Sequence, residues 1–191
     1  MQADRSLTAG PVPLSRAVAR DLLTLFVFSA ALALAVGLVK TRFLIPGHAL
    51  IYRIPLLVLA GACGRPGMAA GSGLLGGLMA RAWGGLGTIE FAGLLAAAAI
   101  VEAFGLGRAI ANRGPLMALA GALAPLGKLG IKLVALLFAG IPLNQAGLPL
   151  LPTIASYLTF GLIGGGLAWG ALRAWSTAEK SRQGTDPSKG R

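Results

Sequence analysis

Acidic residues are scarce in this sequence. It has 6 Asp and Glu against 17 Lys and Arg in 191 residues, and only 12% of the chain is charged. A soluble domain carries about 25% charged residues. With 55% apolar residues and 29 glycines, the chain has too few polar side chains to cover a globular surface in water. This composition excludes an ordinary soluble domain and predicts a chain surrounded by lipid.

Cysteine and histidine occur once each, as Cys63 and His48. A single cysteine excludes an internal disulfide and a cysteine-based metal site, and the scattered carboxylates have no metal-ligand spacing around the one histidine. Gly127-Lys128 lacks the rest of a phosphate-binding loop. An intramembrane serine protease built on Gly71-Ser72-Gly73 would need a histidine on a later helix, whereas His48 comes earlier. We therefore expect no catalytic residues, no cofactor and no metal.

The net charge of +11 raises the question of a nucleic-acid partner. Such a surface needs basic residues gathered on one face, with aromatic or polar partners between them. Here the Lys and Arg residues lie at both termini and between apolar runs, as the positive-inside rule requires. We expect membrane lipid around the chain and no nucleic acid.

Apolar runs define the predicted membrane spans. Residues 22–39 and 152–172 are uncharged over a full span, and four further runs contain isolated charges. The sequence predicts an all-α membrane protein, a bundle of about six transmembrane helices, with five or seven left open. The predicted spans are 22–39, 47–64, 67–86, 88–107, 115–141 and 152–172. The predicted domains are a cytoplasmic N-terminal segment 1–21, a transmembrane helical domain 22–175 and a disordered cytoplasmic tail 176–191.

The basic residues also predict the topology. If six spans alternate from a cytoplasmic N-terminus, the side opposite the termini receives only Lys40, Arg42, Arg53 and Arg81. The other basic residues outside the spans fall on the side of the termini, so both termini are predicted to be cytoplasmic.

Small residues four positions apart let membrane helices approach closely. They occur as Ala31 and Ala35, as interleaved pairs among Gly67, Gly71, Gly73 and Gly77, and as Gly166 and Gly170. This spacing predicts tight packing of the bundle.

Lys128 and Lys132 lie four residues apart within a predicted span, just after Pro125. A charge at membrane depth is costly, so such residues often serve a function. The pair would hold the anionic group of a substrate, or neutralise Glu102 or Glu90. Alternatively, the span is shorter and both lysines extend to a membrane face. Pro125 is expected to break or bend the helix, as at transporter binding sites.

The joint between the first two spans, residues 45–55, contains His48, Tyr52 and Arg53 among turn residues. It is either an outer loop that caps a ligand pocket or a re-entrant turn with interfacial anchors, and we favour the first interpretation.

Residues 22–175 resemble the substrate-binding S components of energy-coupling factor transporters. Ala31-x-x-x-Ala35 looks like the pattern with which that family docks its coupling protein, 46–55 looks like its outer loop, and 67–80 is similar to its glycine-rich third helix. The resemblance implies a bacterial inner-membrane subunit that captures a vitamin, a vitamin precursor or a similar small molecule from outside. Its partners would be a transmembrane coupling protein and cytoplasmic ATPases. The expected substrate-binding residues are His48, Tyr52, Arg53, Lys128, Lys132 and Glu102.

Two other functions remain open. A non-transporting scaffold would have packed helices with no polar pocket. An ion-driven secondary transporter would favour an internal repeat, and the two halves of the sequence show no convincing match.

Overall fold

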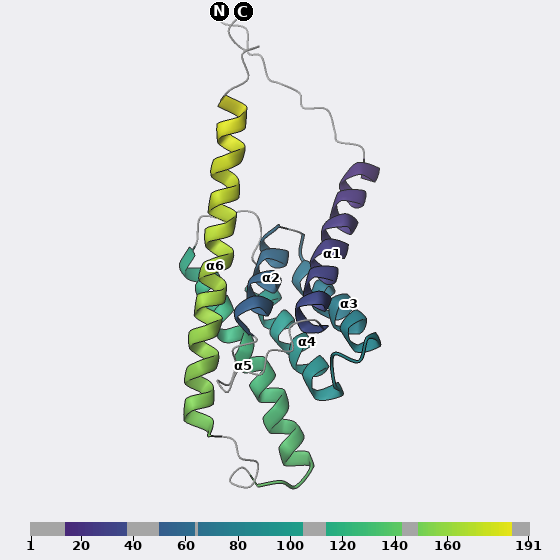
Figure 1. Ribbon diagram of the computed structural model, residues 1–191, viewed down its shortest axis with the longest axis vertical. Helices are drawn as coiled ribbons and strands as arrows, with labels where there is room; N and C mark the ends of the chain where they lie inside the picture. The colour runs from purple at the N-terminus through teal and green to yellow at the C-terminus, as the bar shows by residue number, and fades with distance from the viewer. Residues whose placement is uncertain (1–13, 38–49, 64, 105–113, 143–148, 185–191) are drawn as a thin grey trace, which may run out of the picture.

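The computed structural model describes residues 14–37, 50–63, 65–104, 114–142 and 149–184, which form six α-helices and no strand (Figure 1). The helices are α1 (Leu14–Gly37), α2 (Leu50–Cys63), α3 (Met68–Ala82), α4 (Thr88–Ala103), α5 (Gly114–Phe138) and α6 (Leu150–Gly184). The prediction of an all-helical chain is thus confirmed over these residues.

Three of the helices are long and apolar enough to cross a membrane. The candidate spans are Arg16–Val36 in α1, Gly114–Phe138 in α5 and Leu150–Ala178 in α6. The remaining helices have 14, 15 and 16 residues. At about 1.5 Å per residue, these reach roughly 21–24 Å, which is less than the ~30 Å of a bilayer core. The six helices of the prediction are present, but α3 is shorter than the span predicted for it, and the ends of the spans predicted as 47–64 and 88–107 lie outside the described residues.

The described helix ends differ from the predicted ones at α3 and at α6. The run predicted as 67–86 ends at Ala82, because Gly84 adopts a left-handed φ of 71°. At the other extreme, α6 continues as a helix to Gly184, beyond the predicted domain end at 175. Pro125 lies inside α5, which continues unbroken on both sides of it. Of the break or bend expected at Pro125, the break is therefore absent.

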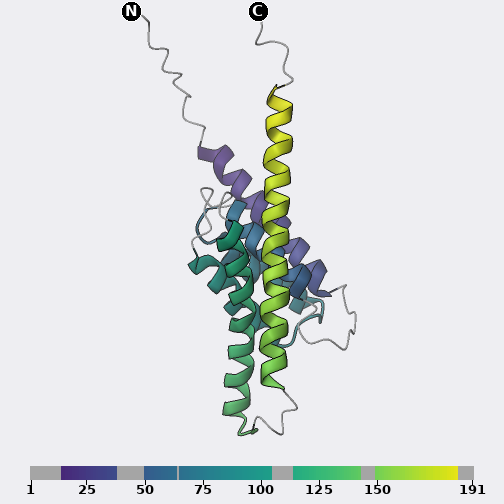
Figure 2. The same ribbon diagram turned by 90° about the vertical axis from the view of Figure 1, so that its left-hand side faces the viewer.

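Helix α2 occupies the centre of the bundle. It contacts all five other helices and contributes the fully buried Ile54, Leu57 and Val58. Helices α5 and α6 pack against each other as an antiparallel pair, and α1 packs mainly on α3 (Figures 1 and 2). Large apolar side chains remain exposed, such as Leu137 at 78% and Phe138 at 87%. An apolar exterior of this kind is suited to lipid.

Glycines bring α5 and α6 into backbone contact. A Cβ added to Gly121 would lie 2.5 Å from the carbonyl oxygen of Gly161 and 2.8 Å from the Cα of Gly165. By contrast, nothing lies within 4 Å of a Cβ at Gly166 or Gly170. Tight packing through small residues is confirmed, but on α6 the face that packs carries Gly161 and Gly165 instead of the expected Gly166 and Gly170.

Helix α3 uses its glycines in the same way. A Cβ at Gly73 would lie 2.5 Å from the Cβ of Ala98 in α4, and one at Gly76 would lie 2.8 Å from the carbonyl oxygen of Ser29 in α1. The glycine-rich helix is therefore held between α1 and α4.

Candidate functional site

Four helices bring ionisable side chains together near one end of the bundle. A pocket of about 300 Å³ is lined by Glu90 of α4, Lys128 and Lys132 of α5 and Tyr157 of α6. Arg53 of α2 lies deeper, in a small cavity that also involves Glu90 and Lys128. Apart from the two lysines, these residues lie far apart in the sequence, and the fold of α2, α4, α5 and α6 gathers them.

Lys128 is at the centre of this cluster. Its stem packs directly on α4, where a Cβ at Gly93 would lie 2.7 Å from its Cγ. Only a glycine at position 93 leaves room for a lysine here. Its charged neighbours are Arg53, Glu90 and Lys132. Among the described residues, the cluster thus has three cations and one carboxylate, an excess of two positive charges that favours an anion.

The cluster extends inward from the pocket. Arg53, Glu90 and Lys128 line an inner cavity of about 10 Å³, together with apolar residues such as Leu57. A volume of ~10–15 Å³ is the least that holds one water molecule. The inner cavity is therefore too small for an organic ligand, which would occupy the outer pocket and meet Lys128 at its base.

Apolar residues form the rest of the outer pocket. They include Ala135, Leu136, Ala139 and Ile141 from the last turns of α5 and the segment that follows. The pocket is thus amphipathic, with a charged base and an apolar wall.

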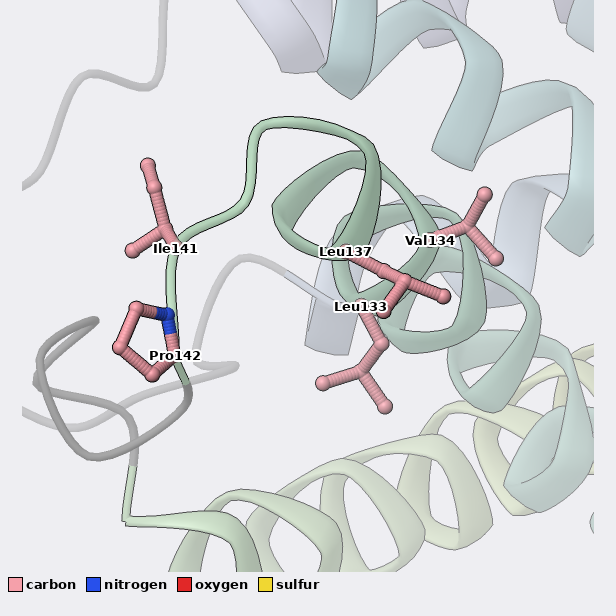
Figure 3. Close-up of a pocket in the computed structure, with 5 residues that line it drawn as sticks. All are labelled: Leu133, Val134, Leu137, Ile141 and Pro142. Carbon is pink, nitrogen blue, oxygen red and sulfur yellow. The ribbon is translucent and has the colours of Figure 1, made fainter.

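A second hollow lies beside the first and shares Ile141 with it. It has a volume of about 360 Å³ and is lined by Leu133, Val134, Leu137, Ile141 and Pro142 (Figure 3). Figure 3 shows three of these side chains on α5 and the other two on the connecting segment, with no charged side chain among them. We place the candidate site in the first pocket, because recognition of a polar ligand needs fixed polar groups as well as apolar area.

Glu102 lies away from this cluster, at the other end of α4. Its carboxylate accepts hydrogen bonds from the backbone N–H groups of Gly67, Ala69 and Ala70, at 3.1 Å and 3.3 Å for the last two. These N–H groups belong to the start of α3, where helical donors lack partners within the helix. In the structure, Glu102 therefore caps α3, and of the two carboxylates considered beside the lysines only Glu90 lies there.

The capping role of Glu102 predicts a loss of stability on its removal. Glu102→Ala is expected to lower the free energy of unfolding by about 2 kcal/mol, because it leaves three backbone donors without their charged acceptor. Glu102→Gln keeps one acceptor oxygen and should cost less. The measurement is the melting temperature in detergent, with Glu90→Gln as control, since Glu90 is exposed and accepts no such hydrogen bond from the described residues. A melting temperature of Glu102→Ala equal to that of the wild type would disprove the cap.

The other predicted site residues have mixed positions. Arg53, Lys128 and Lys132 belong to the cluster, and the last two share one face of α5 as their spacing predicts. His48 and the side chain of Tyr52 lie outside the described residues. Ala31 and Ala35 are half-buried on α1, and nothing in the structure tests their role in docking.

Sequence reasoning missed Tyr157 and Thr153. Tyr157 is 8% exposed and has Arg53 as a charged neighbour. Thr153, one turn earlier and 2% exposed, has a hydroxyl with no hydrogen-bond partner among the described residues. The available signal was a tyrosine in an otherwise apolar span, because a buried Tyr hydroxyl usually needs a polar partner.

Among the described residues, no three His, Cys, Asp or Glu side chains gather into a metal site. Comparison of the chain with protein-family models, with curated proteins and with solved structures gives no match. The class of protein therefore rests on the fold, an all-helical chain with three helices that are long and apolar enough to cross a membrane.

Proposed function

We propose that this chain is a multi-pass membrane subunit that captures a small organic anion for an uptake transporter. The observation that carries the proposal is the pair Lys128 and Lys132 in a pocket with an apolar wall, with Arg53 in the small cavity next to Lys128. Cations inside a membrane domain are costly and often serve a function, and an anionic substrate is the partner that the two lysines would favour.

The pocket chemistry defines the class of ligand. A carboxylate or phosphate would lie over Lys128 and Lys132, where charge-assisted hydrogen bonds are stronger than neutral ones. Glu90 and the hydroxyl of Tyr157 would accept or donate a hydrogen bond to a polar group of the ligand. Its apolar part would lie along Ala135, Leu136 and Ala139. A vitamin-like molecule with an acidic group and an apolar body has this character.

The arrangement of the helices supports capture from outside. The start of α1 and the end of α6 lie at one end of the bundle, and the end of α5 and the start of α6 lie at the other (Figure 1). With the termini in the cytoplasm, as the basic residues predict, the pocket would lie in the outer half of a bacterial inner membrane, because the last turns of α5 form its wall.

Energy for release into the cell would come from other subunits. The sequence has no phosphate-binding loop of its own, and the resemblance to S components implies a transmembrane coupling protein and cytoplasmic ATPases. The half-buried Ala31 and Ala35 of α1 are the residues proposed for docking the coupling protein.

A thermal-shift screen tests the proposal. The purified protein is heated in detergent with vitamins, their precursors and small organic anions, each paired with its neutral amide. A ligand at a hundred times its dissociation constant should add about 2.7 kcal/mol of stability, and we expect this for one or more acids and not for the matching amides. If no compound raises the melting temperature of the well-folded protein, the chain is better explained as a membrane scaffold.

A further inference from the structure

A third hollow lies at the end of the bundle opposite the pocket that contains Lys128 and Lys132, which we call the anion pocket. It is a groove of about 480 Å³ between α1 and α6, with α2 beneath it. Its walls include Leu23, Val27 and Phe28 of α1 and Leu172 and Trp175 of α6, and Leu59 of α2 forms its floor. Figure 1 shows the end of α2 between the two long helices.

The groove is apolar throughout. Its one hydroxyl, that of Thr24, donates a hydrogen bond to the carbonyl oxygen of Arg20 at 2.8 Å and so is satisfied within α1. Val27 is 53% exposed and Trp175 is 75% exposed, so these walls are open to the surroundings. In a membrane-spanning chain, an open apolar groove along two long helices faces lipid chains.

Two arginines extend the groove toward the start of α1. Arg16 and Arg20 are exposed, and they precede Leu23, Thr24 and Val27 at the spacing that keeps all five on one face of the helix. Among the described side chains, the two carboxylates outside the pocket of Lys128 and Lys132 are already engaged. Asp21 pairs with Arg65 at 2.9 Å, and Glu102 caps α3. The two arginines are therefore available to an external anion.

We propose that this groove holds an acyl chain of an anionic phospholipid whose phosphate contacts Arg16 and Arg20. The combination of an apolar groove with cations at one end matches a lipid, which has a long apolar chain and a charged head. The proposal is independent of the anion pocket, which lies at the other end of the bundle.

The test compares two lipids that differ only in the head group. Dioleoyl phosphatidylglycerol and dioleoyl phosphatidylcholine are titrated into the detergent-purified protein, and bound lipid is counted by native mass spectrometry. The wild type is expected to retain phosphatidylglycerol preferentially. Replacing both arginines, as Arg16→Gln with Arg20→Gln, should weaken phosphatidylglycerol binding about 30-fold. Each arginine near an anionic lipid surface contributes a factor of about five in affinity.

Two further arms separate the chain from the head group. Val27→Trp fills the groove at an exposed position and should reduce the binding of both lipids, whereas Lys132→Gln at the other end should change neither. Glycerol phosphate, which has the head group and no chain, should not displace the lipid. Equal retention of the two lipids by the wild type would overturn the proposal. So would an unchanged preference in the double arginine variant, or displacement by glycerol phosphate.

Discussion

Replacing Gly165 with alanine is expected to destabilise the protein by about 2–3 kcal/mol, the cost of adding a methyl group where no space exists. The new Cβ would collide with the Met117 carbonyl and would lie 2.8 Å from the Cα of Ala118, both on α5. The contacted atoms belong to the backbone, so they cannot move aside as the end of a flexible side chain can. Helices α5 and α6 would have to separate along their crossing, and the pocket between α4, α5 and α6 would change shape with them.

The neighbouring glycine provides a matched control. Nothing lies within 4 Å of a Cβ at Gly166, so Gly166→Ala should be neutral or should stabilise the helix by up to ~1 kcal/mol. Both melting temperatures are measured in the same detergent. If Gly165→Ala and Gly166→Ala melt at the same temperature, the close crossing of α5 and α6 is wrong.

Lys128→Gln is expected to weaken binding of the captured anion about 30-fold or more. Removing one partner of a desolvated charged contact typically costs ~2 kcal/mol or more, which corresponds to that factor. Lys128 is half-buried against Gly93 and lies between the outer pocket and the inner cavity, so its charge is poorly screened by solvent. The dissociation constant is measured by equilibrium binding of the best acid from the thermal-shift screen.

The exposed lysine one turn away should matter less. Lys132→Gln is expected to weaken the same binding by about fivefold, because an exposed charge contributes at most ~1 kcal/mol. Arg16→Gln, at the far end of the bundle, should leave binding unchanged. Equal effects of Lys128→Gln and Arg16→Gln would show that the anion does not bind at the cluster.

The long helices were predictable from sequence because length and hydropathy depend on residues that are adjacent in the chain. The apolar runs of α1, α5 and α6 have this property. The ends of α3 and the extension of α6 depend on features that hydropathy does not report, such as the left-handed Gly84 and a polar helix that continues beyond the span. Hydropathy therefore located the elements better than it located their ends.

The lysine pair of the cluster was predictable from the sequence of one helix, whereas its association with side chains of other helices was not. Lys128 and Lys132 share a face of α5 by helical spacing alone, so their pairing was predictable. Glu102 was expected to bind substrate and Glu90 was considered only as a partner of the lysines, and the packing of α3 against the end of α4 separates their roles in the structure. Tyr157 entered the site because the glycines of α6 bring it close to α5, which is a tertiary effect.

Accessibility of the pocket in intact cells tests substrate capture from outside most directly. Cys63 is the sole cysteine, so Cys63→Ala with Ala139→Cys places one thiol in the apolar wall of the pocket. We expect a membrane-impermeant maleimide to label this thiol from outside, and the best acid from the screen to slow labelling while its amide does not. Labelling only in inverted membrane vesicles would contradict an outward-facing pocket, and labelling unaffected by the acid would contradict anion capture at this cluster.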